Sequence, residues 1–261
     1  MIATVLIGLM TPAASEATRV GLGATATAPS ECFSPQQAPY ASTSCQVFDG
    51  GQLEIVALAT RDEGGVRLMP QPFTLFELRR RGGPLPIVSF THFDDSDADD
   101  DPLVTPTRNT DYELRFNGNQ DMPPGTSATM AVDVGARITI PSEASSGRSS
   151  RIRVPATVAV SRRALRGRIE LRRCHRTKAT SARSCARPRS YTVVASRRPA
   201  RTRTVAFGIA APARSYRRYE IVFRPRSARF ATTRQAFTVL NGYDGRTTYR
   251  PTVRSAPFGN R

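Results

Sequence analysis

An acidic run is the first group of residues whose type and spacing suit a chemical role. Six aspartates stand within residues 94–101. Asp95, Asp97 and Asp99 repeat at alternate positions, the spacing with which a loop wraps Ca²⁺ in oxygen ligands. However, Asp100 stands where such a loop needs glycine, and Pro106 where it needs a bidentate glutamate. Because close carboxylates repel one another and favour solvent, we interpret the run as an exposed turn and keep a Ca²⁺ loop as the alternative.

A larger group of cations occupies the second half of the chain. Residues 1–141 hold 9 arginines against 17 Asp and Glu, a net charge of −8, whereas residues 142–261 hold 29 Arg and Lys against 4 Asp and Glu, a net charge of +25. Such a cationic surface attracts polyanions, for example wall teichoic acid, anionic lipid headgroups, nucleic acid or an acidic protein. The alternative is a solvated basic face that pairs with the acidic half. The candidate anion-binding residues lie on two predicted hairpins: Arg162, Arg163, Arg166, Arg168, Arg172, Arg173, Arg197 and Arg198.

The aromatic content near these arginines narrows the choice of partner. Stacking of bases needs interleaved aromatic side chains, and only Tyr191 and Phe207 are near. We therefore expect an anionic cell-wall polymer or an acidic protein as the partner, and no sequence-specific recognition of nucleic acid.

Side chains for catalysis are scarce in this sequence. The only histidines are His92, beside the acidic run, and His175, within an arginine-rich segment. The sequence has no nucleophile elbow of the GxSxG type and no glycine-rich phosphate loop that leads into a helix. We therefore expect no enzyme and no cofactor, and only a pair of carboxylates from distant segments stays open as a catalytic arrangement.

The four cysteines fall into two close pairs. Of the three connectivities that four cysteines allow, Cys32–Cys45 and Cys174–Cys185 are the simplest, because each closes a short loop. The CxxC spacing typical of a zinc site is absent from the sequence. We predict two disulfides, which an exported chain would form, and no metal site.

The N-terminal residues have the pattern of a secretory signal. The apolar run Ile2–Met10 is followed by small residues at Ser15 and Ala17, where a signal peptidase would cleave. The run lacks the preceding Lys or Arg of a typical signal, and a buried strand or core helix is the alternative. No stretch reaches the roughly 20 apolar residues of a transmembrane helix. We expect an extracellular or cell-surface protein without a transmembrane segment.

Alternation of apolar and polar residues predicts the elements that position these groups. Residues 112–116 (Tyr-Glu-Leu-Arg-Phe) place their apolar side chains on one face of a strand, and residues 219–223 (Tyr-Glu-Ile-Val-Phe) repeat the motif. Glu-Leu-Arg-Arg precedes each copy, at 77–80 and 170–173, which predicts two similar units with a longer hairpin at 174–185 in the second. The predicted strands are 53–60, 73–80, 85–90, 111–117, 128–140, 152–160, 167–173, 190–196, 202–210, 216–224 and 235–240.

Composition divides the chain into a predicted series of segments. The boundaries follow from the signal pattern, the Ser/Gly run at 142–151 and the change in charge. The series is a signal peptide at 1–17, an N-terminal extension with a disulfide at 18–50, an acidic β-sandwich at 51–141, a linker at 142–151, a basic β-sandwich at 152–243 and a C-terminal tail at 244–261. An edge strand around 247–253 is the alternative for part of the tail.

Residues 104–118 (VTPTRNTDYELRFNG) resemble the penultimate hairpin of immunoglobulin-like or fibronectin-III-like modules, which repeat in exported proteins of high-GC Gram-positive bacteria. The resemblance covers about residues 50–240 and is specific in the first copy alone. It implies two tandem Ig-like antiparallel β-sandwiches, with Tyr112 and Tyr219 as corner tyrosines whose hydroxyls bond to nearby backbone. The chain has no Trp and no Cys pair spaced to bridge two sheets, which excludes antibody-type domains.

These observations lead to one expected function and two alternatives. We expect an all-β, exported, non-enzymatic protein that serves as a cell-surface binding or spacer module, with its basic second unit bound to an anionic polymer or protein. One alternative is an accessory region of a secreted hydrolase, in which carboxylates would line a cleft. The other is an intracellular basic protein, which would require free thiols.

Overall fold

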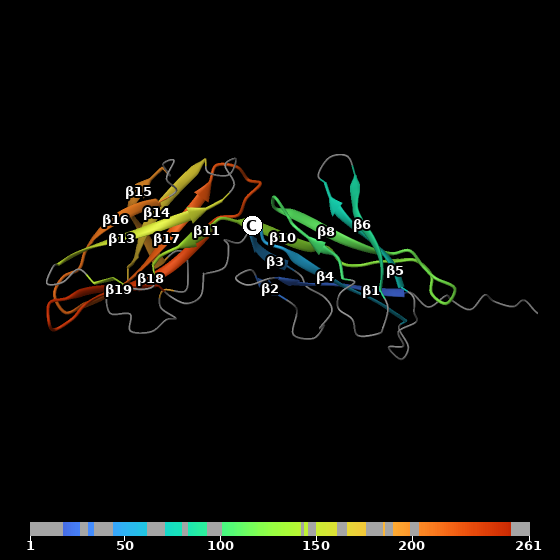
Figure 1. The fold of residues 1–261 in the computed structure, drawn as a ribbon, viewed down its shortest axis with the longest axis horizontal. Helices are drawn as coiled ribbons and strands as arrows, with labels where there is room; N and C mark the ends of the chain where they lie inside the picture. Colours follow the sequence, from blue (N-terminus) through green and yellow to red (C-terminus); the bar gives the residue numbers. More distant parts are fainter. Residues whose placement is uncertain are drawn as a thin grey trace, which may run out of the picture.

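The computed structural model describes residues 18–26, 31–33, 44–61, 71–79, 83–92, 101–141, 144–145, 150–160, 166–175, 185, 190–198 and 204–251. Within these ranges every helix or strand element is a β-strand, and the strands form four sheets (Figure 1). The predicted all-β class is therefore confirmed. The predicted signal peptide at 1–17 and the calcium candidates Asp95, Asp97 and Asp99 lie outside the described residues.

Two sheets that face each other form the first sandwich. Its strands are β1 (Thr18–Ala26), β2 (Glu31–Phe33), β3 (Ser44–Phe48), β4 (Leu53–Arg61), β5 (Gln71–Leu78), β6 (Pro84–His92), β7 (Leu103–Val104), β8 (Thr110–Phe116), β9 (Gly125–Thr126) and β10 (Met130–Gly135). One sheet has the order β1-β4-β7, and the other has the order β2-β3-β10-β8-β5-β6, with β9 paired to β8. Neighbouring strands are antiparallel apart from β3 and β10, which run parallel.

Two further sheets form the second sandwich. Its strands are β11 (Arg137–Thr139), β12 (Ala144–Ser145), β13 (Arg151–Ala159), β14 (Gly167–Cys174), β15 (Tyr191–Arg197), β16 (Thr204–Ala210), β17 (Ser215–Pro225), β18 (Thr233–Asn241) and β19 (Thr247–Pro251). The sheet orders are β11-β13-β16 and β12-β19-β18-β17-β14-β15. The series β1-β4-β7 with β6-β5-β8-β10 thus has the same order as β11-β13-β16 with β15-β14-β17-β18. The two halves share a common core topology.

The buried faces of the strands follow the predicted alternation. Tyr112, Leu114 and Phe116 are buried between the sheets of the first sandwich, and their neighbours Glu113 and Arg115 are half-buried on the other face. In the second sandwich Tyr219, Ile221 and Phe223 occupy the matching core positions. There, however, Glu220 and Val222 are buried as well, so this strand has two buried faces.

The second sandwich begins earlier in the chain than predicted. The predicted strand 128–140 is divided at Ala136 into β10, which belongs to the first sandwich, and β11, which belongs to the second. Ile138 and Ile140 pack in the second core. The pairing of β12 with β19 also places residues 144–145, within the predicted linker, in the second sandwich.

Both predicted flanking segments contribute to the sandwiches. In the predicted N-terminal extension, β1 pairs with β4 and β3 with β10, and Leu22, Cys45 and Val47 lie in the first core. In the predicted tail, β19 forms the strand that the alternative predicted, but it lies between β18 and β12 and not at the edge of the sheet. Tyr249 on this strand is buried at 1% exposure in the second core. Propensity around small and polar residues underestimates such strands, because their stability comes from pairing and burial.

Strand register shows that the Tyr-Glu-x-x-Phe motifs of the two sandwiches are structurally equivalent and that the Glu-Leu-Arg-Arg motifs are not. On β8 and β17, Leu114 lies opposite Leu75 and Ile221 lies opposite Leu171. Leu75, and not Leu78, is therefore the structural counterpart of Leu171. The two Glu-Leu-Arg-Arg motifs are out of register by three residues, so Glu77 and Glu170 occupy different positions in their sheets. The predicted longer hairpin of the second unit is present, because β14 ends at Cys174 and β15 begins at Tyr191, whereas β5 ends at Leu78 and β6 begins at Pro84.

Both predicted disulfides are formed in the structure. Cys32 and Cys45 lie opposite each other on β2 and β3 with Cα atoms 4.1 Å apart, and Cys174 and Cys185 are joined with Cα atoms 6.0 Å apart. Cys45 is fully buried in the first core. Two disulfides indicate a protein of an oxidising, non-cytoplasmic compartment.

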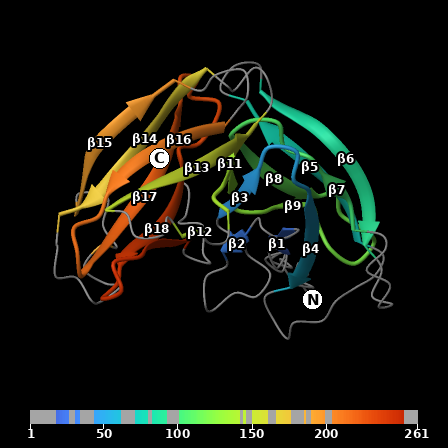
Figure 2. The same cartoon turned by 60° about the vertical axis from the view of Figure 1, so that its left-hand side comes forward.

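The turn between β17 and β18 joins the two sandwiches, which lie side by side in Figure 2. Phe230 packs against both cores. The backbone N–H of Asn109 donates to the carbonyl of Arg229 at 2.7 Å, and the N–H of Ala231 donates to the carbonyl of Val134 at 2.8 Å. The Asn109 side-chain oxygen accepts from the Val134 N–H at 2.8 Å. Backbone hydrogen bonds and a shared aromatic ring therefore hold the junction.

Candidate functional site

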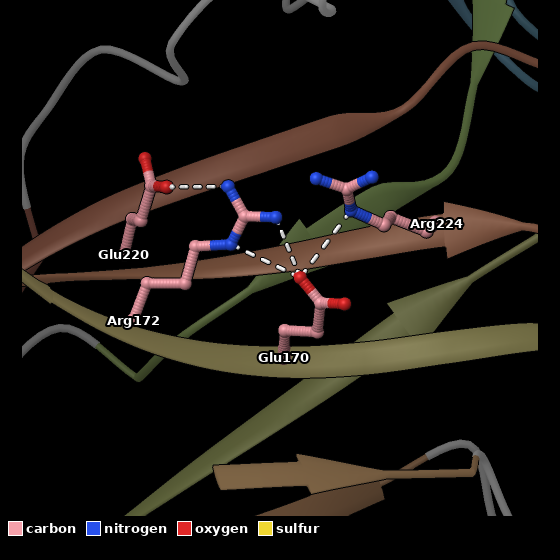
Figure 3. A network of polar contacts seen from close by, with 4 residues as sticks. All are labelled: Glu170, Arg172, Glu220 and Arg224. Atoms are coloured by element: carbon pink, nitrogen blue, oxygen red, sulfur yellow. Dashed lines mark hydrogen bonds and ion pairs between the residues drawn. The ribbon is translucent and has the colours of Figure 1, made fainter. Parts of the chain in front are cut away.

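A buried network of charges lies on the outer face of the second sandwich (Figure 3). Glu170 and Arg172 stand two residues apart on β14, so both side chains point to the same face, and Glu220 lies opposite Arg172 on β17. The Arg172 guanidinium contacts Glu170 at 2.6 Å and Glu220 at 3.5 Å, and Arg224 contacts Glu170 at 3.3 Å. Arg172 and the two carboxylates have side-chain exposures below 10%. One arginine thus neutralises two buried carboxylates, with Arg224 at the solvent side.

Neighbouring strands add further charge around Glu220. Burial raises the pKa of the Glu220 carboxyl, and Arg234 on β18 and Arg172 on β14 act in the opposite direction. Burial and the charge of Glu220 also raise the pKa of Tyr191 on β15. The network is therefore surrounded by groups from four adjacent strands, an arrangement typical of a structural ion-pair network.

The structure separates the eight predicted anion-binding arginines into three groups. Arg162 and Arg163 lie outside the described residues. Arg172 is 6% exposed and bound to two carboxylates, so the prediction that it contacts an external anion is wrong: its charge is used inside the sandwich. The exposed members are Arg166, Arg168, Arg173, Arg197 and Arg198.

The three described carboxylates of the second half contact arginines of the same half. Residues 142–261 contain four Asp and Glu, and Glu143 among them lies outside the described residues. Glu170 and Glu220 belong to the buried network, and Asp244 contacts Arg246 at 3.7 Å. The cations of this half far outnumber its carboxylates, with 29 Arg and Lys against four Asp and Glu. The result is a strongly positive surface.

One hollow in this surface is lined by Arg197, a predicted anion-binding residue, and by Arg151 and Arg153, which were not predicted. Its volume is about 410 Å³, and its lining residues are Arg151, Ile152, Arg153, Arg197, Ala206 and Gly208. Arg151 and Arg153 are alternate residues of β13, and Ala206 and Gly208 are alternate residues of β16, the strand beside it. The Arg-x-Arg alternation is visible in the sequence, but the pairing with a strand of small residues is not, because strand pairing depends on the fold.

Two adjoining hollows of about 620 and 810 Å³ lie at the junction of the sandwiches. Both are lined by Glu77, Arg108, Thr110, Ser227 and Arg229. Arg108 donates to Glu77 at 2.5 Å. Asp49 also lines the first hollow and Asp111 the second, so both cations and carboxylates line this cleft.

The predicted corner tyrosines, Tyr112 and Tyr219, are buried in the cores of the two sandwiches. Burial and the charge of Glu77 raise the pKa of Tyr112 to about 12, and Tyr219 stacks on Phe237 with ring centroids 5.5 Å apart. Within the described residues neither hydroxyl has a hydrogen bond to the backbone. The rings, and not the predicted hydroxyl bonds, therefore account for the burial of both residues.

The histidines do not join a cluster that resembles a metal centre. His92 Nδ1 lies 3.7 Å from Asp101, and both ring nitrogens of His175 lie about 3 Å from the Thr192 hydroxyl. In the part of the chain that the structure describes, no three His, Cys, Asp or Glu residues are grouped so that they could hold a metal ion.

Comparison with known proteins adds no assignment. No protein-family model matches the chain, and no curated protein is significantly similar to it. Among the described residues, no helix has the length and apolar character needed to cross a membrane. The charges and the geometry of the chain are therefore the features that bear on its function.

Proposed function

We propose that this chain is an exported, non-enzymatic binding module of tandem Ig-like or fibronectin-III-like type, whose second sandwich binds an anionic polymer of the cell surface. The observation that carries the proposal is the distribution of charge. Arginines remain exposed on the second sandwich after its described carboxylates have been paired. Surface potential of this kind concentrates polyanions and steers their approach.

Two further observations support the exported module. Both disulfides close short loops, as in proteins of oxidising compartments. The shared strand order of the two sandwiches supports the resemblance to repeated β-sandwich modules. The resemblance also agrees with a role in binding, because such modules present large exposed sheets.

The proposal is tested by a salt titration with the full-length protein and a linear polyphosphate. We expect log Kd to rise linearly with log salt, because arginines that contact phosphates release counterions. The variant Arg166→Gln/Arg168→Gln should bind more weakly and show a slope smaller by about 0.7 for each lost contact. The matched control Arg79→Gln/Arg115→Gln removes two cations from the acidic sandwich and should leave the slope unchanged. Equal losses in both double variants would contradict the proposal.

The cleft favours the hydrolase alternative as a second candidate function. Three carboxylates, Asp49, Glu77 and Asp111, line the adjoining hollows, and junctions between domains are common sites for small ligands. This alternative predicts polysaccharide hydrolysis by the wild type that is lost in Glu77→Gln. The binding module predicts no hydrolysis by either protein. Release of reducing sugars from cell-wall polysaccharide distinguishes the two.

A further inference from the structure

Strand β6 forms one edge of the large sheet in the first sandwich. Among the described strands its partner is β5, so one side of its backbone faces away from the sheet. The carbonyl of Pro72 on β5 accepts from the N–H of Asn117, which follows β8, and therefore points away from β6. Thr91 lies opposite Pro72, so its own N–H and C=O groups point outward from the sheet, as do those of Ser89. Figure 2 shows β6 at the outer margin of the first sandwich.

The second half of β6 lacks the features that usually prevent pairing at a sheet edge. Charged side chains, prolines and bulges are the usual protection. Pro84, Pro86 and a bulge at Ile87 occupy the first half of the strand, whereas residues 88–92 contain no Pro, Lys, Arg, Asp or Glu. A segment of this length is typical of β-strands. Residues 88–92 can therefore form a ladder with a further strand.

Val88 and Phe90 give this edge an apolar side. Both pack against the first core, and the ring of Phe90 lies 5.7 Å from the ring of Phe73. Both are nevertheless only half-buried. A strand added beside β6 would remove more of these two side chains from water.

Opposite charges stand before and after β6 in the sequence. Arg79, Arg80 and Arg81 precede it, and six aspartates follow it within residues 94–101. In an antiparallel pair of identical strands, the start of each strand lies beside the end of the other. Two copies of β6 would therefore direct the arginines of one chain toward the aspartates of the second, at both ends of the pair. This charge complementarity identifies a second copy of the chain as the partner.

The equivalent edge of the second sandwich opposes such self-pairing. Strand β15 has the same place as β6 in the strand order, but its bulge at Val194 is central and its last residue is Arg197. Residues 175–190 before it contain Arg and Lys without Asp or Glu, and Arg198 follows it. An antiparallel pair of β15 strands would place cations beside cations at both ends.

We propose that two copies of the chain pair antiparallel along residues 88–92 of β6 and form a two-fold symmetric dimer with one continuous sheet. With Phe90 opposite Phe90 of the second copy, Ser89 lies opposite Thr91 of that copy. The outward N–H of each then donates to the carbonyl of the other, and symmetry repeats the exchange. The two Phe90 side chains meet at the centre of the contact. The pairing goes beyond the proposed function and does not depend on it.

Sedimentation equilibrium of the full-length protein over a range of concentrations tests the pairing. We expect the wild type to form a dimer and no larger species as the concentration rises, because a two-fold contact closes on itself. Ser89→Pro removes an outward N–H that β5 does not use, and we expect the Kd of the dimer to rise about tenfold or more. The matched control is Ser196→Pro, because Ser196 is the equivalent of Ser89 on β15. We expect this control to dimerise as the wild type does.

Reversal of the flanking charges tests the antiparallel direction. Arg80→Asp/Arg81→Asp makes both flanks of β6 acidic. A second variant makes both flanks basic by reversing four of the six aspartates: Asp94→Arg/Asp95→Arg/Asp97→Arg/Asp99→Arg. We expect each variant alone to dimerise about tenfold more weakly than the wild type, because like charges then meet at both ends. An equimolar mixture should form a mixed dimer about as tight as that of the wild type, because opposite charges meet again.

Three results would overturn the pairing, and none of them bears on polymer binding by the second sandwich, which the salt titration measures. The first is a wild type that stays monomeric at every concentration. The second is a dimer that Ser89→Pro leaves unchanged or that Ser196→Pro weakens equally, because the contact then lies elsewhere. The third is a mixture of the two charge variants that stays monomeric. Melting temperatures show whether Ser89→Pro is folded, and if it is not, the charge variants decide, because they leave the sequence of β6 unaltered.

Discussion

The outer faces of the two large sheets differ at equivalent positions. In the first sandwich Phe76 lies opposite Glu113, and Arg115 contacts Glu113 at 2.8 Å and lies 4.3 Å from the centre of the Phe76 ring. In the second sandwich Arg172 replaces Phe76 opposite Glu220. The first arrangement is half-exposed, whereas the second is buried.

This difference shows that the same strand topology can carry either a partly exposed or a buried arrangement of charges on its outer face. On the first sheet, a partly exposed arginine guanidinium lies over an aromatic ring and beside a carboxylate. On the second sheet, two carboxylates and an arginine are removed from water and depend on one another. Removal of one member is costly there because the remaining charges are buried without a partner. The same kind of substitution should therefore have very different effects on the two faces.

The largest effect is expected for Arg172→Ala. Loss of the guanidinium leaves Glu170 and Glu220 buried together, and we expect the free energy of unfolding to fall by about 3–5 kcal/mol. Urea denaturation at pH 7 measures the change. The variant Glu170→Gln/Arg172→Met/Glu220→Gln removes the whole set and should be markedly more stable than Arg172→Ala. If both variants are equally destabilised, lost packing, and not unpaired charge, is the cause.

The contrast between the two faces also shows which structural features can be predicted from the sequence and which cannot. The period of two along residues 112–116 predicted which side chains face the core, because alternation is a local property of a strand. It could not predict that Glu220 is buried, because burial of its face depends on groups that β14, β15 and β18 bring together. The two Glu-Leu-Arg-Arg motifs are not structurally equivalent for the same reason. The register of β5 and β14 is set by their pairing with β8 and β17, and not by local sequence similarity.

The candidate site was predictable in its charge but not in its position. The surplus of arginine in the second half was visible by counting, whereas the hollow at Arg151 and Arg153 depends on small residues more than fifty positions later in the chain. Arg172 was selected by its place in an arginine-rich hairpin. Its burial comes from Glu220, a residue that only the fold places beside it.

The second-largest loss of stability is expected when the disulfide of either sandwich is removed. The cysteines of each pair are separated by 13 and 11 residues, so loop closure predicts a similar loss of about 3 kcal/mol for Cys32→Ala/Cys45→Ala and for Cys174→Ala/Cys185→Ala. Cys45 is fully buried beside Met130, and its replacement should add a packing loss in the first sandwich. Denaturation with and without reductant measures both. A smaller loss for the first pair would break this expectation.

Glu113 and Glu220 occupy equivalent positions on β8 and β17, so the pH dependence of stability can be compared between the two faces. Because burial raises the pKa of Glu220, the folded state holds that proton more tightly, and the protonated form contributes stability that is lost as pH rises through the raised pKa. Glu220→Gln cannot ionise, so its free energy of unfolding should fall less than that of the wild type as the pH rises from 4 to 8. The groups that oppose this trend are Arg172, Arg224 and Arg234, which favour the ionised form. Glu113→Gln is the matched control, and an equal trend there would remove the distinction between the faces.

The smallest effect is expected for Arg115→Ala on the first sandwich. The side chain of Arg115 is 42% exposed, so water and salt screen its contact with Glu113. Its ion pair and its contact with the Phe76 ring together should stabilise the fold by about 1 kcal/mol or less. The loss should also shrink in 1 M NaCl, where exposed charges interact weakly, whereas most of the loss in Arg172→Ala should persist because its partners are buried. A loss in Arg115→Ala as large as that in Arg172→Ala would mean that position in the sheet, and not burial of charge, determines the contribution of these arginines.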